Sequence, residues 1–199
     1  MSEDRTYRAK EHVNWRASVE DGRAEVADDG RLVLVYLTKP TCGGSATMGA
    51  RTYPVGEVQQ AIERDFVPVI QDLGDDPDLE EERFDFGWTP TFVVQDGAGP
   101  EHRRTSGYMD APRFVGELAL ARVSAAVDRR DWETAATRVD EALERVGDDP
   151  ERRAGALYFS AVVAFRRSGE REDLEAGWNR LLDELPESEW ARRAEYIRL

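Results

Sequence analysis

The chain has 199 residues, 40% of them apolar, and a formal net charge of −14. This length allows one large domain or two small ones, each able to bury its own core, and we expect two. The acidic charge argues against nucleic acid and anionic membranes as partners, because binding either requires a clustered basic surface.

The apolar runs, the N-terminal segment and the cysteine count together indicate the cellular compartment. No apolar run approaches the roughly 20 residues needed to cross a bilayer. Residues 1–11 form a polar tail that lacks the basic and then apolar layout of a signal peptide. The only cysteine, Cys42, has no partner for an internal disulfide. We therefore expect a cytoplasmic protein in which Cys42 is either a plain buried residue or a thiol kept reduced.

Two elements are predicted before the cysteine. Val13 to Ala27 has the period of a loosely amphipathic helix that includes Trp15. Arg31 to Thr38 is an unbroken aliphatic and β-branched run, which is typical of a strand buried on both faces.

Cys42 follows this strand in the turn Lys39-Pro-Thr-Cys-Gly-Gly-Ser45. If a helix begins just after Cys42, its unpaired N–H groups and its dipole favour the thiolate, which is the nucleophilic form. Ser45 occupies the position at which a dithiol oxidoreductase carries its second sulfur. The pattern therefore predicts a reactive site in outline, without a resolving thiol.

A second helix, Val55 to Arg64, and a second strand, Phe66 to Ile70, are predicted next. Asp72 to Glu82 is then an acidic run, which we interpret as a solvated loop or short exposed helix. A metal site is the alternative, because carboxylates are hard oxygen ligands. The run lacks the glycine and terminal glutamate of an EF-hand loop, so the solvated interpretation is favoured. The carboxylates concerned are those of Asp72, Asp75, Asp76 and Asp78.

A strand from Phe86 to Val94 is entered through Pro90. Proline is tolerated at the first residue of a strand, and a tight X–Pro bend is the usual setting for a cis peptide. Glu101 to Gly107 should pair back as a polar edge strand. Asp110 is predicted to cap a further helix. The buried face of that helix is predicted to carry Phe114, Leu118, Ala121 and Ala125.

Strand patterns stop near Val127, and the rest of the chain has a helical period. Pro150 and Pro186 occupy matching positions, each opening a helix after an acidic turn, at a spacing typical of helix-pair repeats. Four helices are predicted, over Trp132–Val146, Glu151–Arg167, Glu170–Leu185 and Glu187–Leu199.

Residues 12–126 resemble the thioredoxin-fold superfamily, in the branch with a Met after the cysteine motif. The resemblance implies an α/β fold with a central mixed sheet flanked by helices. It depends on Trp15, Cys42-Gly43-Gly44-Ser45, Met48, Thr52-Tyr53, Val58 to Val69, Gly87-Trp88-Thr89-Pro90-Thr91 and Gly107-Tyr108.

In that superfamily the loop proline is cis and packs beside the reactive cysteine, next to backbone that pairs with an extended peptide segment of the substrate. The resemblance therefore implies Cys42 as the nucleophile and Thr89 and Pro90 as groove residues. Trp88 could line the groove or belong to the core. Gly43 and Gly44 complete the predicted substrate-binding set.

Ser45 is grouped with Cys42 as a candidate catalytic position, and it departs from the dithiol pattern. A mixed disulfide formed at Cys42 must then be broken by glutathione or another small thiol. Ser45 is not expected to be a nucleophile, because His12 and His102 lie in polar segments predicted to be exposed and neither is placed to act as its base. One cysteine and two separated histidines cannot supply the ligands of a zinc site without several carboxylates. Neither a metal nor a cofactor is therefore expected.

Residues 127–199 resemble tetratricopeptide helices, with fewer than the three repeats that usually stand alone. The resemblance depends on Trp132, Ala135 and Ala136, Ala156-Leu157-Tyr158, and Pro186 to Ala194.

Two functions stay open. The first is a monothiol redox protein whose Cys42 forms mixed disulfides with protein thiols or glutathione. The second is a non-catalytic module that binds a partner through the thioredoxin groove, the helical extension or both. The pKa of Cys42 separates them, because a value well below the free-cysteine figure of about 8.5 favours redox chemistry.

Overall fold

The computed structural model describes residues 11–26, 30–74 and 87–198. Phe86, most of the predicted tail and the acidic run after Gly74 lie outside the described residues, including Asp75, Asp76 and Asp78. The chain divides into two compact units, Met1–Phe114, here called the sheet unit, and Val115–Leu199, the helical unit. The domain boundary expected after residue 126 stays a prediction.

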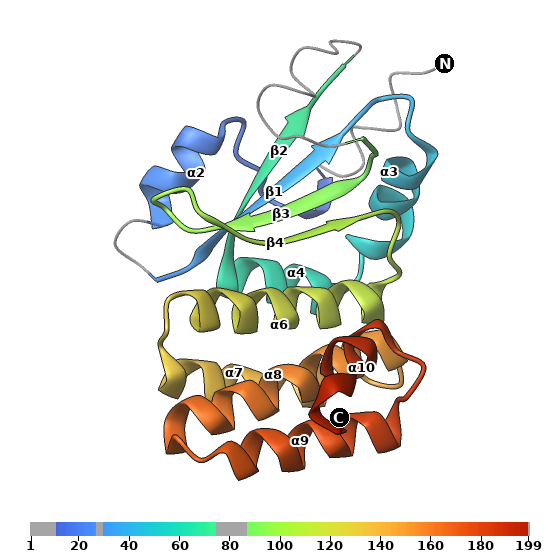
Figure 1. The fold of residues 1–199 in the computed structure, drawn as a ribbon. Coiled ribbons are helices and arrows are strands. Elements are labelled where there is room, and N and C mark those ends of the chain that lie inside the picture. The colour runs from blue at the N-terminus through green and yellow to red at the C-terminus, as the bar shows by residue number, and fades with distance from the viewer. Residues whose placement is uncertain (1–10, 27–29, 75–86, 199) are drawn as a thin grey trace. The chain divides into compact units, whose positions relative to one another are not determined.

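A four-stranded mixed sheet forms the centre of the sheet unit (Figure 1). Its strands lie in the order β2-β1-β3-β4; β1 runs parallel to β2 and antiparallel to β3, and β4 runs antiparallel to β3. Every residue of β1 is buried, as its unbroken apolar run predicts. The predicted α/β fold with a central mixed sheet is confirmed. The strands are β1 (Leu32–Thr38), β2 (Phe66–Asp72), β3 (Thr91–Gln95) and β4 (Glu101–Ser106).

Helix α2 (Val19–Val26) packs on one face of this sheet. Its buried Val19 and Val26 join a cluster with Val33 and Val69 from the strands. Gly22 permits this close approach, because a Cβ there would lie only 2.5 Å from Cγ2 of Val69.

The helix predicted from Val13 was wrong in its first part, because residues 14–18 are not helical. The Arg16 N–H donates to the Pro68 carbonyl at 2.8 Å, and the Ile70 N–H donates to the Arg16 carbonyl at 3.0 Å. This segment therefore pairs with the outer edge of β2. Pairing satisfies backbone groups that an edge strand would otherwise leave open, and it outweighs the local helical period.

The opposite face of the sheet carries five aromatic rings in mutual contact. Trp15, Tyr36 and Tyr53 lie with ring centroids 5.3 to 5.6 Å apart. Phe92 stacks on Tyr36 at 5.2 Å and contacts Phe114 at 4.9 Å. Each such pair contributes about 0.5–1.5 kcal/mol beyond the burial of its area. Trp15 therefore reaches the core from an extended segment and not from a helix.

Helical turns connect β1 to β2 (Figure 1). They are α3 (Gly43–Thr47), a π-helical turn (Met48–Thr52) and α4 (Gly56–Asp65), the last of which confirms the helix predicted over 55–64. The π-helical turn closes with a bond from the Tyr53 N–H to the Met48 carbonyl at 3.0 Å.

The helical unit confirms the four predicted C-terminal helices. Pro150 is the first residue of its helix, as predicted. Pro186 instead lies before Ser188, the N-cap of the last helix, so the two prolines do not open their helices at matching positions. The helices are α6 (Ala111–Asp128), which begins in the sheet unit, α7 (Trp132–Arg145), α8 (Pro150–Ser168), α9 (Arg171–Glu184) and α10 (Glu189–Ala194), followed by a 3₁₀ turn (Glu195–Arg198).

Small residues and aromatic rings pack the helical unit. A Cβ on Gly177 of α9 would lie 2.4 Å from the Ala161 Cβ of α8, so these two helices are in close contact. Trp178 stacks on Tyr158, and its indole N–H donates to the Tyr158 carbonyl at 3.3 Å. Trp190 contacts the same tyrosine ring at 5.1 Å. Helix packing therefore accounts for these two tryptophans, as predicted.

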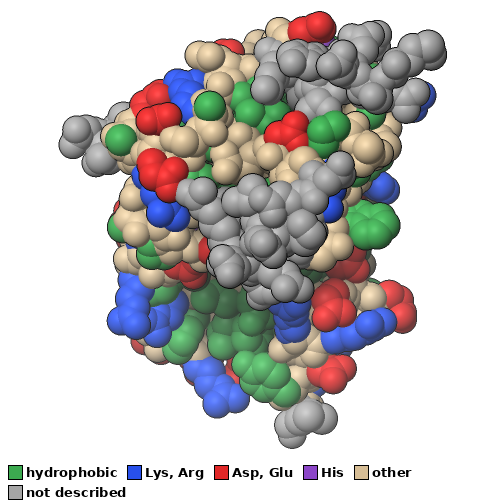
Figure 2. Space-filling model, turned by 90° about the horizontal axis from the view of Figure 1, so that it is seen from above, with side chains coloured by type: hydrophobic (Ala, Val, Ile, Leu, Met, Phe, Trp, Pro, Cys, Tyr) green, Lys and Arg blue, Asp and Glu red, His purple; other side chains and the backbone are tan. Residues whose placement is uncertain are grey.

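One face of the molecule is mixed in charge. Figure 2 shows Lys and Arg side chains interspersed with Asp and Glu on the face it displays. In the described part of the chain, no helix combines the length and the apolar character needed to span a bilayer.

Candidate functional site

Cys42 is the N-cap residue of α3. A turn after β1 presents it there, closed by a bond from the Cys42 N–H to the Lys39 carbonyl at 3.0 Å. The Ser45 N–H then donates to the Cys42 Sγ at 3.4 Å. The sulfur therefore lies where the sequence predicted it, at the beginning of a helix that directs an N–H group toward it.

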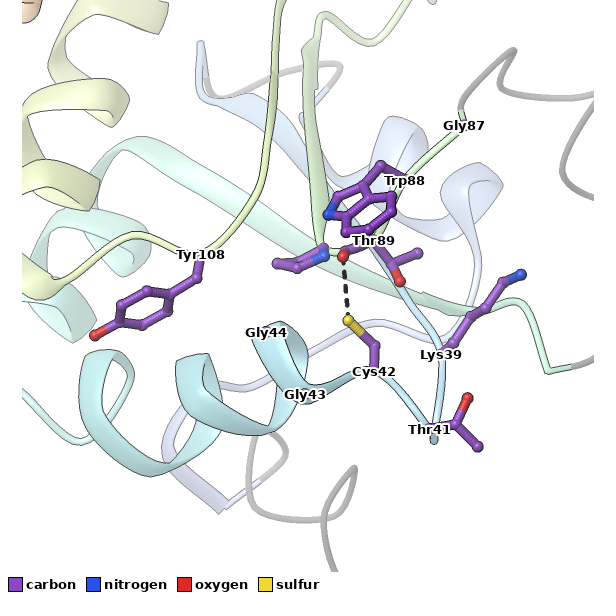
Figure 3. A pocket seen from close by; sticks show the side chains of 10 residues that line it. Lys39, Thr41, Cys42, Gly43, Gly44, Gly87, Trp88, Thr89 and Tyr108 are labelled. Carbon is purple, nitrogen blue, oxygen red and sulfur yellow. Dashed lines mark hydrogen bonds between the residues drawn. The ribbon is translucent and has the colours of Figure 1, made fainter.

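The Thr89–Pro90 bond is cis, as predicted, and this bend lies next to Cys42. The Cys42 thiol donates to the Thr89 carbonyl oxygen at 3.1 Å (Figure 3). The bend is held from two sides. The Gly107 N–H donates to the Pro90 carbonyl at 2.7 Å, and the Thr91 hydroxyl donates to the Trp88 carbonyl at 2.6 Å.

Gly44 is required for this approach. A Cβ at Gly44 would lie 2.8 Å from the Pro90 Cδ and 3.7 Å from the Cys42 Sγ. The Pro90 ring is rigid and cannot turn away as a long side chain would. A Cβ at the neighbouring Gly43 would meet no atom within 4 Å.

The pKa of the Cys42 thiol lies below its ordinary value. Burial raises this pKa, but the Ser45 and Thr89 side chains and the backbone N–H groups of Ser45 and Gly44 lower it by more. Donors directed at the sulfur stabilise the thiolate, which is why the lowering effects prevail. The thiol–carbonyl bond to Thr89 belongs to the protonated form and is lost when the sulfur ionises.

A pocket of about 580 Å³ opens beside the sulfur (Figure 3). The structure brings six of the seven predicted site residues together in its lining: Cys42, Gly43, Gly44, Trp88, Thr89 and Pro90. Trp88 is 70% exposed, so it belongs to the pocket mouth and not to the core. Lys39, Thr41, Gly87 and Tyr108 complete the described lining.

Ser45 is the predicted site residue that does not line the pocket. It is 6% exposed, and its carbonyl accepts a long 3.5 Å bond from the buried Tyr36 hydroxyl. The Ser45 hydroxyl makes no hydrogen bond of ordinary geometry to the described residues. Its backbone N–H is therefore the better-defined contact with Cys42, although its side chain also contributes to the lowered pKa of the thiol.

Histidine does not take part in this site. The His102 side chain is only 3% exposed and lies 3.3 Å from an Asp96 carboxylate oxygen, so the expected exposure of His102 was wrong. His102 is the second residue of β4, and Asp96 lies in the turn that joins β3 to β4, so the hairpin places the two side chains together. Across residues 11–26, 30–74 and 87–198, no three His, Cys, Asp or Glu side chains are grouped so that they could hold a metal.

The sequence model of the family described as "Thioredoxin-like domain" matches residues 19–122, which is more than half of the chain. The chain belongs to the thioredoxin-like domain family. Solved structures similar to it include the following three. A thioredoxin from Thermus thermophilus is 25% identical, with 56% of this chain and 90% of that chain covered and a TM-score of 0.49.

The second is a DsbH oxidoreductase, 12% identical, covering 62% of this chain and 85% of its own at a TM-score of 0.44. The third is the oxidised C-terminal domain of DsbD from Neisseria meningitidis, 21% identical, covering 47% of this chain and 83% of its own at a TM-score of 0.40.

Four lining residues of the thioredoxin-like domain were not predicted as site residues. Lys39 and Thr41 belong to the same turn as Cys42, so their sequence proximity was a usable signal. Gly87 directly precedes the predicted Trp88. Gly107-Tyr108 was among the residues behind the resemblance, but nothing in the sequence near Tyr108 indicated that it lines the pocket, which it reaches from the segment between β4 and α6.

Proposed function

We propose that the protein works as a monothiol that forms mixed disulfides through Cys42. The Cys42 thiolate attacks one sulfur of a disulfide; a new S–S bond forms, the old one breaks, and the leaving thiolate takes its electron pair. Cys42 is oxidised and the departing thiol is reduced. The chain has no second cysteine, so an external thiol such as glutathione must release the adduct.

One observation supports this proposal above the others. The Cys42 sulfur has a lowered thiol pKa and lies at the edge of a pocket, between the Ser45 N–H and the Thr89 carbonyl. An inert structural cysteine is enclosed in apolar surroundings, which raise its pKa, whereas a reactive one has nearby donors and access to reagents. The proposed partners are protein thiols, extended peptide segments that lie along the Trp88–Pro90 bend, or small thiols.

The proposal includes a reducing compartment such as the cytoplasm. A lone thiol stays available for exchange only where thiols are kept reduced.

The test is the pH dependence of alkylation of Cys42 by iodoacetamide. We expect the rate to follow a pKa below the free-cysteine value of about 8.5. The same protein in urea supplies the unfolded reference, and Cys42→Ser supplies the background. A folded-state pKa equal to or above the value in urea would exclude this function.

The variant Ser45→Cys tests whether a resolving thiol is all that the protein lacks to act as a dithiol reductase. It restores a second thiol at the position whose backbone N–H already lies 3.4 Å from the Cys42 sulfur. We expect the variant to gain reductase activity toward a generic disulfide such as insulin. Absence of that gain, with the fold intact, would favour binding without turnover.

That alternative, a non-catalytic binding module, is favoured by one feature, the 70% exposure of Trp88 beside the pocket. Exposed aromatic rings are frequent anchors of binding surfaces. A tetratricopeptide-like role for residues 127–199 belongs to the same proposal. Capture of a partner that persists in Cys42→Ser and is lost in Trp88→Ala would support the module.

A further inference from the structure

Four hydroxyl groups lie together in the core of the sheet unit, next to the beginning of α3. They belong to Tyr36 and Thr38 of β1, to Ser45 of α3, and to Tyr53 after the π-helical turn. Each of these residues is at most 6% exposed. Burial raises the pKa of the Tyr36 hydroxyl overall, and the other three side chains lie close enough to lower it in part.

These hydroxyls are incompletely hydrogen-bonded. With the described residues, the hydroxyls of Thr38, Ser45 and Tyr53 make no hydrogen bond of ordinary geometry. The Tyr36 hydroxyl makes one long bond, of 3.5 Å, to the Ser45 carbonyl. Burying polar groups without partners costs free energy, so native proteins rarely group them in this way unless another state of the molecule uses them.

Ionisation of Cys42 supplies an acceptor for this group. In the structure the thiol donates to the Thr89 carbonyl at 3.1 Å, and a neutral thiol is itself only a weak acceptor. The thiolate has no proton to donate and accepts strongly. Ser45 is near enough to serve it, because its N–H lies 3.4 Å from the sulfur. Burial raises the pKa of Cys42, whereas the Ser45 side chain is among the groups that lower it.

We propose that Tyr36 is a positioning residue whose hydroxyl donates to the Ser45 hydroxyl, so that the Ser45 hydroxyl donates to the Cys42 sulfur once the thiol has ionised. This inference rests on the proposed function, because it specifies how the attacking thiolate of that exchange is held. Each hydroxyl has one proton, so a donor behind Ser45 directs the Ser45 proton toward the sulfur. Hydrogen bonds in such a chain strengthen one another.

Tyr36 is suited to donate throughout this change. Burial raises the pKa of its hydroxyl, and a negative charge on Cys42 raises it further, whereas the pKa of Cys42 is lowered. The phenol therefore keeps its proton while the thiol loses its own. Tyr36 takes no part in bond making or proton transfer.

The test is a double-mutant cycle with Tyr36→Phe and Ser45→Ala, measured as the rate of alkylation of Cys42 by iodoacetamide against pH. Tyr36→Phe retains the aromatic ring and removes only the hydroxyl. Tyr158→Phe is the matched control, because it removes one phenol hydroxyl from α8 in the helical unit. Every variant retains the other titratable side chains of the described pocket lining, which are Lys39 and Tyr108.

We expect Ser45→Ala to slow alkylation at pH 7 about tenfold and Tyr36→Phe about threefold, because each variant loses stabilisation of the thiolate. The double variant should be about tenfold slower, like Ser45→Ala alone, since Tyr36 acts through Ser45. The plateau rates at high pH should agree within about twofold, because the thiol is then ionised in every protein. Tyr158→Phe should keep the wild-type profile.

Uniform incorporation of 3-fluorotyrosine is a second measurement, which does not depend on the folding of Tyr36→Phe. Fluorine makes the phenol a stronger donor, so alkylation at pH 7 should become faster in wild type. It should not become faster in Ser45→Ala, where the connecting hydroxyl is missing.

Three results would overturn the inference. An unchanged profile for Tyr36→Phe, or a fluorotyrosine effect that persists in Ser45→Ala, would mean that Tyr36 does not act through Ser45. A loss of about thirtyfold in the double variant would mean that the two hydroxyls act independently. Slowing that persists at the high-pH plateau would mean that the phenol only supports packing. A wild-type pKa of Cys42 no lower than its value in urea would instead exclude the proposed function itself.

Discussion

One helix of the sheet unit, α3, begins as three helices of the helical unit do, but with a different capping atom. The sheet unit also has oxygen caps, at Ser18 and Asp110. In the helical unit Asp131, Asp149 and Ser188 accept the backbone N–H three residues later through oxygen, at 3.0 to 3.1 Å. In the sheet unit the Cys42 sulfur accepts the Ser45 N–H at 3.4 Å. The position and the spacing are the same, and only the accepting atom differs.

This difference separates stability from reactivity. Carboxylate and hydroxyl oxygens are good acceptors and stabilise a helix start, whereas a neutral thiol is a weak acceptor. The sulfur becomes a strong acceptor only when it ionises, so the same N–H group that caps α3 also lowers the pKa of the Cys42 thiol. The three oxygen caps of the helical unit stabilise the starts of their helices. The sulfur cap of α3 instead gives Cys42 a lowered thiol pKa, which favours the nucleophilic thiolate.

Replacing the sulfur by oxygen gives the largest expected effect. Cys42→Ser should abolish mixed-disulfide formation, because no other thiol exists in the chain. Serine is a better N-cap, so the free energy of unfolding should stay equal or rise by up to about 1 kcal/mol. Intact mass after incubation with a disulfide, together with urea denaturation, measures both. A clear loss of stability would mean that the sulfur serves structure instead of reactivity.

Gly44→Ala should disturb the site through packing. Its Cβ would lie 2.8 Å from the Pro90 Cδ, and overpacking of this kind typically costs about 1–3 kcal/mol. The displaced bend should also slow alkylation of Cys42. Urea denaturation and alkylation rates measure the two effects.

Gly43→Ala is the matched control for this variant, since a Cβ there meets no atom within 4 Å. It should be neutral or stabilising by up to about 1 kcal/mol, because alanine is the better helix former. Equal losses in the two alanine variants would contradict the role assigned to the contact between Gly44 and Pro90.

Removing an oxygen cap should have a smaller effect. Ser188→Ala removes the acceptor of the Ala191 N–H at the start of α10 and should lower the free energy of unfolding by about 1 kcal/mol. Alkylation of Cys42 should be unchanged. A change in the pH dependence of that alkylation would show that the two kinds of cap are not independent.

The smallest effect is a pH dependence of stability. The pKa of the Cys42 thiol is lowered in the folded state, so between the folded and unfolded pKa values the unfolded chain binds more protons. Stability from this group is therefore fully present above the unfolded pKa and is lost as pH falls through the folded pKa. The stability of wild type relative to Cys42→Ser, measured in urea between pH 6 and pH 9, should rise with pH. A flat or falling difference would refute the lowered pKa.

Local patterns predicted much of this molecule. The unbroken run that became β1 and the Asp110 cap of α6 agree with the structure, since each depends on neighbours in the sequence. The cis bend at Pro90 was also expected from local chemistry. Trp15 was placed wrongly, because pairing of Arg16 with β2 is a long-range contact that helical periodicity does not report.

The sequence by itself determined the strand that presents Cys42, the absence of a second thiol and the proline that bends beside it. These features depend on side-chain type and on short-range backbone preference. Only the tertiary structure decided that the Thr89 carbonyl contacts the sulfur, that Trp88 is exposed, and that Tyr108 shares one pocket with Cys42. The contacts of Thr89 and Tyr108 require segments more than forty residues apart to meet, and that meeting is set by sheet pairing and core packing, which no single stretch of sequence encodes.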